Sequence, residues 1–206
     1  MAERRPTRKR ADNDSRETGI ADHLAPEYPR PIMLPEYRIL QAFGEINSDL
    51  VSPLIACIHL INAQNAAGAS DSTPIRLFVN SDGGHFEDGF ALVDTILNSI
   101  VPVHTFCIGR AYSVALPIFL AGHDRSMYRH SSVMFHGVSI DGAGGTAKSL
   151  HSTVDDVDKC NSTMKEFVTS RCKIPPAMLK AAIEKNKDLY IYPDDVLRYK
   201  MAHRII

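Results

Sequence analysis

Hydrophobic and polar positions along most of the chain follow two alternating periods, which predict strands separated by helices. Short apolar runs bounded by glycine, proline or polar residues predict strands over 38–44, 75–80, 101–109 and 189–192, and one or two more over 125–138. Apolar residues at helical spacing predict helices over 47–65, 86–100, 114–121, 146–172, 176–185 and 193–202. Asn47 or Ser48 is the expected cap of the first helix, and Ser81–Gly84 is expected to turn the chain. This order predicts a layered α/β domain with largely parallel strand pairing.

The first thirty residues follow neither period. They are rich in charge and lead into a segment, 23–37, that contains four prolines. We therefore predict a mobile, charged and proline-rich tail over 1–30 and a single domain over 31–206. The basic run at 4–10 is a candidate contact for phosphates or an acidic partner, although a solvated tail or a removable pro-segment is the interpretation we prefer.

Composition and charge narrow the classes of partner. The 206 residues carry 23 Lys and Arg against 24 Asp and Glu, a net charge of −1, which gives no argument for nucleic acid or an anionic membrane. No apolar run approaches the ~20 residues of a spanning helix, and no apolar stretch follows the basic N-terminus as in a secretory signal. The four cysteines form no C-x-x-C pair, so we expect buried free thiols and an intracellular, cytoplasmic protein: Cys57, Cys107, Cys160 and Cys172.

Several common site types are absent from the sequence. There is no G-x-x-x-x-G-K-[ST] phosphate loop and no H-E-x-x-H zinc motif. His85 and Glu87 give H-x-E, but the P-C-x-x-C of zinc deaminases does not follow. The glycines of 142–147 resemble a dinucleotide-binding turn, yet the acids that follow lie inside a predicted helix rather than after a second strand. We therefore expect no metal and no cofactor.

Three loops carry candidate chemistry. Ser113 lies where a strand gives way to a helix, which would place its hydroxyl beside free backbone N–H groups and suit both a nucleophile and an oxyanion hole. Gly83 and Gly84 follow the preceding strand, and parallel packing would bring their backbone beside Ser113. His136 closes another apolar run and is a candidate general base. Ser113 as a helix cap and His136 as a structural residue are the alternatives, and spacing alone does not show that the loops converge.

Four segments together resemble the family of Clp protease proteolytic subunits (ClpP). Val79–Gly84 is similar to the family's I-N-S-P-G-G turn, and Gly109–Leu116 is similar to its G-Q-A-A-S-M-G-A pattern. Ser131–His136 is similar to S-R-V-M-I-H, and the segment that begins at Asp188 is similar to D-x-[FW]-[LM]-[ST]. The motifs occur in the family's order and near its spacing, and the resemblance covers about residues 37–206.

The resemblance implies a serine endopeptidase. Ser113 would be the nucleophile, His136 the general base and then acid, and Asp188 the carboxylate that orients the imidazole. Backbone N–H groups of Gly83 and Val114 would hold the tetrahedral oxyanion. A substrate would lie extended beside the strand after the glycine turn and the strand that carries His136, and would pair through main-chain hydrogen bonds.

The resemblance also implies an architecture and partners. The fold would consist of repeated β-β-α layers of the ClpP/crotonase type, with the helix over 146–172 as a protruding handle. The assembly would be a homo-oligomer of heptameric rings, stacked as a tetradecamer around a closed chamber. Unfolded polypeptides would be the substrates, fed by a separate AAA+ ATPase. The absence of a phosphate-binding loop from this sequence fits ATP hydrolysis by that separate protein.

Departures from the family's pattern leave other functions open. Asp82 replaces a proline and adds charge near the oxyanion site, while Pro117 is expected to crowd the Ser113 carbonyl and distort the helix start. Lys200 replaces a helix-ending glycine. The alternatives are a catalytically impaired ring subunit, a specialised assembly or maturation protease that needs no ATPase, and an acyl-CoA-binding relative with the crotonase fold.

Overall fold

The computed structural model describes residues 33–68, 73–139 and 146–206. The predicted tail over 1–30, its basic run and the glycines of 142–145 lie outside the described residues. All described residues belong to one unit of the fold, Pro31–Ile206.

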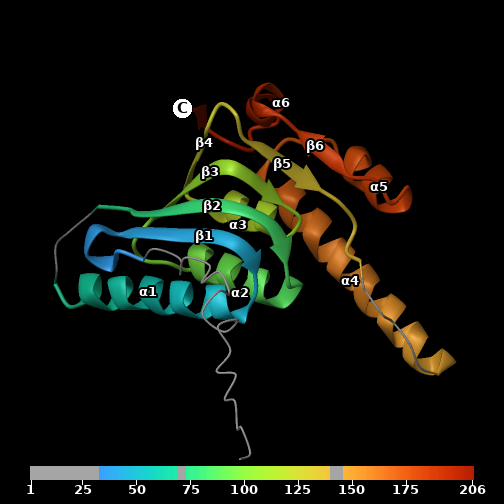
Figure 1. Ribbon diagram of the computed structural model, residues 1–206, viewed down its shortest axis with the longest axis horizontal. Helices are drawn as coiled ribbons and strands as arrows, with labels where there is room; N and C mark the ends of the chain where they lie inside the picture. The colour runs from blue at the N-terminus through green and yellow to red at the C-terminus, as the bar shows by residue number, and fades with distance from the viewer. Residues whose placement is uncertain (1–32, 69–72, 140–145) are drawn as a thin grey trace, which may run out of the picture. The chain divides into compact units, whose positions relative to one another are not determined.

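Seven strands of the described chain form one sheet: β1 (Ile39–Ile46), β2 (Ile75–Gly84), β3 (Val103–Tyr112), β4 (Asp124–Met127), β5 (Ser132–Phe135), β6 (Leu189–Ile191) and β7 (Arg204–Ile205). The order is β1-β2-β3-β4-β7, and β5 pairs with both β3 and β6 (Figure 1). Every pair is parallel except β5 with β6. The predicted α/β class with largely parallel pairing is confirmed, and the segment 125–138 forms two strands.

The helices of the described chain follow the apolar spacing closely: α1 (Ser48–Ala66), α2 (Phe86–Leu97), α3 (Ala115–Ala121), α4 (Ala147–Arg171), α5 (Pro176–Glu184) and α6 (Pro193–Arg198), with a short 3₁₀ helix, η2 (Pro35–Tyr37), before β1. The side chain of Asn47 caps α1 by accepting a hydrogen bond from the Leu50 N–H at 3.1 Å. The Thr146 hydroxyl likewise accepts from the Ser149 N–H at 3.2 Å and starts α4. Caps of this kind fix where a helix begins because they satisfy otherwise free N–H groups.

One face of the sheet packs against α1, α2 and α3 (Figure 1). Along β2, Ile75 and Leu77 are fully buried while Arg76 between them is exposed, as the two-residue period of a strand requires. Phe78 and Phe106 stack on the opposite face with ring centroids 4.9 Å apart. The core therefore holds the central strands rigidly, and with them the loops that follow their carboxyl ends.

The handle predicted over 146–172 forms the long helix α4. In Figure 1 its first half runs away from the sheet. Met164 and Val168 in the second half are buried, whereas Leu150 and Val154 in the first half are 40% and 57% exposed. Only the C-terminal half of α4 is therefore anchored in the core of this chain.

The prediction that Ser81–Gly84 turns the chain is wrong, because these residues continue β2. Gly83 and Gly84 still pair with β1, and the chain bends only at His85, before α2. The pairing of β2 shifts register against both neighbouring strands, and φ is +109° at Gly83 and +152° at Gly84. Adjacent glycines permit a bulged strand as readily as a turn, which is why the sequence pattern misled.

The expected distortion at the start of α3 is also not found. The helix begins at Ala115, so Pro117 lies in the first turn, where a backbone N–H has no partner inside the helix. The Ser113 carbonyl accepts a hydrogen bond from the Leu116 N–H at 3.0 Å instead. Pro117 is thus compatible with a regular helix that starts directly after Ser113.

Candidate active site

Ser113 lies between the end of β3 and the start of α3, as the sequence predicted. Its N–H donates to the carbonyl of Met134 in β5 at 3.0 Å, which ties this turn to the neighbouring strand. Its φ of +52° is left-handed, a conformation that costs a residue with a Cβ about 1–2 kcal/mol. Strain of this kind is concentrated at functional sites. The side chain is half-buried, and within the described chain its hydroxyl makes no hydrogen bond.

The glycine segment lies directly against Ser113. A Cβ added at Gly83 would lie 2.6 Å from the Ser113 Cβ and 3.2 Å from its hydroxyl oxygen. No side chain fits there, so the close approach requires glycine. The sequence-based expectation that the two loops meet is therefore correct for Gly83 and Ser113.

The two expected oxyanion donors differ in the structure. The N–H of Gly83 donates to the hydroxyl oxygen of Ser81 at 3.0 Å. The N–H of Val114 has no hydrogen-bond partner among the described residues, because it precedes the first turn of α3. Val114 thus offers an open donor beside Ser113, while Gly83 offers one only after releasing Ser81. The sequence analysis did not identify Ser81, which lies inside the glycine motif and is buried.

Strand register brings His136 and Asp188 to the same edge of the sheet. In the antiparallel pair of β5 and β6, Met134 lies opposite Tyr190 and Phe135 opposite Leu189. His136 directly follows β5 and Asp188 directly precedes β6, so one further step in this register would set them opposite each other. Ser113 follows the end of β3, whose Tyr112 pairs with Met134. All three predicted triad residues therefore flank the same short stretch of strand ends.

The side chains of the triad are not yet hydrogen-bonded to one another. Among the described residues no hydrogen bond joins Ser113 to His136 or His136 to Asp188; the Asp188 carboxylate instead accepts from the Tyr190 hydroxyl at 3.4 Å. His136 is half-buried and Asp188 is exposed. Catalytic hydrogen bonds are often long without substrate and tighten only in the complex.

Asp82 does not leave an unbalanced charge beside the site. Its carboxylate lies 3.1 Å from the Arg110 guanidinium, with Asp82 69% and Arg110 49% exposed. A pair this exposed contributes about 1 kcal/mol or less to stability. The charge that the sequence places at this turn is therefore compensated locally by β3.

The handle contacts the segment that follows His136. The Asn161 side-chain oxygen on α4 accepts a hydrogen bond from the Val138 N–H at 2.8 Å. Because Val138 comes two residues after His136, this bond restrains the backbone on which the imidazole sits. Sequence analysis missed Asn161, since helical periodicity shows which face is apolar but not which loop a polar side chain meets.

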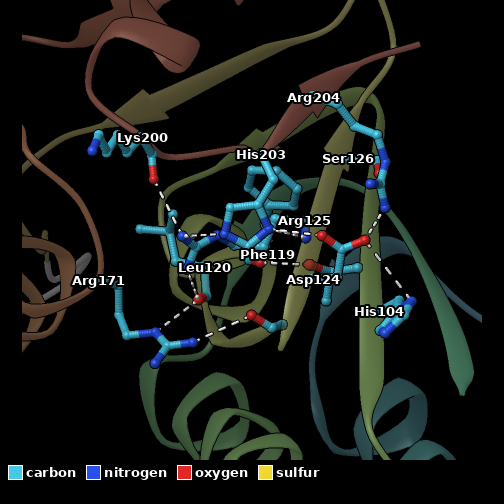
Figure 2. A network of polar contacts seen from close by, with 12 residues as sticks. His104, Phe119, Leu120, Asp124, Arg125, Ser126, Arg171, Lys200, His203 and Arg204 are labelled. Atoms are coloured by element: carbon cyan, nitrogen blue, oxygen red, sulfur yellow. Dashed lines mark hydrogen bonds and ion pairs between the residues drawn. The ribbon is translucent and has the colours of Figure 1, made fainter.

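Arg125, which is buried, and Arg171, which is half-buried, bind the carbonyls at the C-terminal end of α3 (Figure 2). The Leu120 carbonyl accepts from Arg125 Nη1 at 3.1 Å and from Arg171 Nε at 3.0 Å, and Arg171 also donates to the carbonyls of Ala121 and Gly122. Cations at a helix C-terminus satisfy its last carbonyls and oppose the negative end of its dipole. Helix α3, which starts just after Ser113, is thus held at its other end by β4 and by the end of α4.

The same network fastens the C-terminal strand to the sheet (Figure 2). Arg125 Nη2 donates to the Lys200 carbonyl at 3.2 Å, and His203 Nδ1 lies 2.8 Å from Asp124 Oδ1. Arg204 pairs with the other oxygen of Asp124. Burial, and then the positive charges of Arg125 and Arg171, lower the pKa of His203.

Burial raises the pKa of all four cysteine thiols. All four cysteines are free, as predicted, but only Cys107 and Cys172 are buried, whereas Cys57 and Cys160 are half-buried. Burial raises the pKa of the Cys107 thiol to about 12, which keeps it protonated at neutral pH.

A pocket of about 500 Å³ opens between α5 and β6, next to Asp188, and its wall is mostly apolar: Met178, Ala181, Ala182, Lys185, Lys187, Asp188, Leu189 and Tyr190.

No group of three or more potential metal ligands occurs within the described ranges. Among the helices of those ranges, none is both long and apolar enough to cross a bilayer.

Comparison with known proteins gives one consistent family. The family model described as Clp protease matches residues 30–206. The ATP-dependent Clp protease proteolytic subunit 1 of Prochlorococcus marinus subsp. pastoris is 24% identical over 192 residues, 92% of each chain. The corresponding subunit of Deinococcus radiodurans is 25% identical over 171 residues, 82% of this chain and 80% of that protein. A solved ClpP1 mutant from Listeria monocytogenes matches with a TM-score of 0.70 at 19% identity, over 84% of this chain and 92% of its own, which confirms the predicted fold.

Proposed function

This chain belongs to the Clp protease family, and we propose that it is a serine endopeptidase whose catalytic triad is Ser113, His136 and Asp188. The observation that supports this proposal most strongly is the strand register. The pairing of β5 with β3 and β6 supports the proposal by bringing to one edge the strand ends next to Ser113, His136 and Asp188, and Gly83 packs without a side chain against the strained turn at Ser113.

In the proposed reaction, the Ser113 hydroxyl attacks the carbonyl carbon of a peptide bond while His136 takes its proton. His136 then gives that proton to the leaving amine, and water repeats the sequence to release the acyl group. Asp188 orients the imidazole and stabilises its charged form. The tetrahedral oxyanion would accept hydrogen bonds from Val114 N–H and, once Ser81 releases it, from Gly83 N–H. One such donor contributes about 2.7–4 kcal/mol of transition-state stabilisation.

The geometry limits where a substrate strand can pair. Both edges of β5 are occupied, by β3 on one side and β6 on the other, so a substrate cannot add to residues 132–135. The expected pairing beside the strand of His136 is therefore wrong for β5 itself. We propose that main-chain pairing uses the segment beyond His136, which the bond from Val138 to Asn161 holds in place.

The exposed first half of α4 supports the proposed assembly. Leu150 and Val154 are large apolar side chains that remain 40% and 57% exposed in the described chain. We propose that this handle docks one heptameric ring onto another as a tetradecamer, in the cytoplasm, with an AAA+ ATPase feeding unfolded polypeptides into the chamber. Light scattering of the purified protein gives the mass, and Leu150→Lys with Val154→Lys should reduce it to single rings.

The peptidase proposal is tested with a fluorophosphonate probe and small fluorogenic peptides. The wild-type protein should be labelled and should cleave the peptides, and Ser113→Ala should abolish both while the assembly mass stays the same. Ser52→Ala, which changes an exposed serine on α1, is the matched control and should react like wild type. Labelling of Ser113→Ala at the wild-type rate would remove Ser113 from the mechanism.

A catalytically impaired ring subunit is the second candidate. Two observations favour it. The Gly83 N–H is hydrogen-bonded to the Ser81 hydroxyl, and among the described residues no hydrogen bond joins the side chains of Ser113, His136 and Asp188 to one another. Such a protein would assemble with the same mass and stay unlabelled at every probe concentration. The labelling experiment therefore separates the two candidates directly.

A further inference from the structure

Two tyrosine rings link the strand of the nucleophile to the strand of the acid. Tyr112 precedes Ser113 at the end of β3, and Tyr190 lies two residues after Asp188 in β6. Their rings meet edge to face, with centroids 5.5 Å apart and an interplanar angle of 86°. Contacts of this geometry are favourable and orient both rings.

The register explains why the rings meet. Met134 of β5 pairs with Tyr112 on one side and with Tyr190 on the other, so the three residues form one row across three strands. His136 is two residues beyond Met134 and directly follows β5. The tyrosine pair thus lies two residues before the predicted general base.

The hydroxyl of each tyrosine has a hydrogen-bond partner. The Tyr112 hydroxyl lies 2.7 Å from the Ser132 hydroxyl of β5, and the Tyr190 hydroxyl donates to Asp188 Oδ2 at 3.4 Å. Loss of solvation and the negative charge of Asp188 raise the pKa of the Tyr190 phenol, which keeps it a proton donor. Asp188 itself is exposed, and this is its one hydrogen bond from a side chain within the described residues.

We propose that Tyr190 is a positioning residue for Asp188, and that Tyr112 holds the Tyr190 ring in place. The phenol fixes one carboxylate oxygen, which leaves the other directed across the ladder to His136. An exposed aspartate without this bond would rotate freely and spend less time in the orientation that supports the imidazole. The inference rests on the proposed function. It goes beyond the family pattern quoted above, which has alanine before the serine and phenylalanine or tryptophan two residues after the aspartate.

The test compares Tyr190→Phe, which removes only the hydroxyl, with Tyr192→Phe as the matched control. Tyr192 is 61% exposed, and its hydroxyl has no hydrogen bond within the described chain. Tyr190→Phe should lower kcat and the fluorophosphonate labelling rate about tenfold with KM unchanged, as expected for one hydrogen bond to a charged group. It should also shift the acid limb of the pH profile of kcat/KM, which a merely structural role would not do. Tyr112→Phe should give a smaller loss, and Tyr192→Phe none.

Failure of this inference is distinguishable from failure of the proposed function. A wild-type protein that never reacts with the probe refutes the peptidase, and with it the positioning role. A reactive wild type whose rate and pH profile survive Tyr190→Phe refutes the positioning role alone. A phenolate absorbance titration gives a readout independent of activity: Asp188→Asn should lower the pKa of Tyr190, and an unchanged pKa would overturn the contact.

Discussion

Replacing Gly83 by alanine separates the geometry of the site from the stability of the fold. The added Cβ would lie 2.6 Å from the Ser113 Cβ and 3.1 Å from the Tyr112 carbonyl oxygen. Non-bonded carbon atoms normally approach to about 3.5–4.0 Å, so either Ser113 or the glycine segment must move by roughly 1 Å. Gly44 provides the control, because its φ is also positive, at +88°, and nothing lies within 4 Å of a Cβ added there.

The two substitutions should share a stability cost and differ in activity. Positive φ at a residue with a Cβ costs about 1–2 kcal/mol, so both variants should lose about that much free energy of unfolding. Only Gly83→Ala displaces the nucleophile or an oxyanion donor. A misplacement of about 1 Å, or the loss of one donor, corresponds to a decrease in rate of about a hundredfold or more.

Urea unfolding measures the first quantity, and the fluorophosphonate labelling rate measures the second. Gly83→Ala should label at least about a hundredfold more slowly than Gly44→Ala at comparable stability. If both variants label at the wild-type rate, the conclusion that Gly83 borders Ser113 is refuted. If both label equally slowly, stability, and not the contact with Ser113, controls the rate.

Other parts of the structure give predictions that do not depend on this contact. Lys200, the second residue after α6, has a φ of +56°, so Lys200→Gly should raise the free energy of unfolding by about 1 kcal/mol in urea titrations; a lower free energy of unfolding would contradict backbone strain at this position. Arg125→Met leaves the Lys200 carbonyl without the guanidinium that is 3.2 Å away and should cost about 3 kcal/mol in the same assay; a neutral result would show that the network contributes little. Asn161→Ala should slow peptide cleavage, whereas Asn161→Asp, which keeps an acceptor for the Val138 N–H, should retain most of the rate; equal losses would exclude the hydrogen bond as the cause. Because the pKa of His203 is lower in the folded protein than in the unfolded chain, the unfolded chain takes up the proton first, and stability should fall as pH drops below about 6.5; His203→Gln should flatten that slope, and an unchanged slope would contradict the shift.

The sequence predicted the elements well because their signals are local. Apolar side chains at helical spacing, and a cap such as Asn47, depend only on near neighbours, and α1 begins where that cap places it. Parallel pairing follows from the alternation of strands and helices. The position of Ser113 at a strand-to-helix junction follows from the same reasoning.

The contacts that complete the site are not local, and periodicity could not supply them. His136 and Asp188 come to the same edge because of the register between β5 and β6, which depends on the whole sheet. Ser81 binding the Gly83 N–H depends on a bulge that the glycine pattern predicted as a turn. The bond from Tyr190 to Asp188 depends on the same register.

A crystal structure of the protein after reaction with a fluorophosphonate tests the central claim most directly. We expect phosphorus bonded to the Ser113 oxygen, His136 hydrogen-bonded to both the adduct and Asp188, and a phosphoryl oxygen facing the N–H groups of Val114 and Gly83. An adduct on a different residue, or Asp188 directed away from His136 in every subunit, would contradict the proposed catalytic triad.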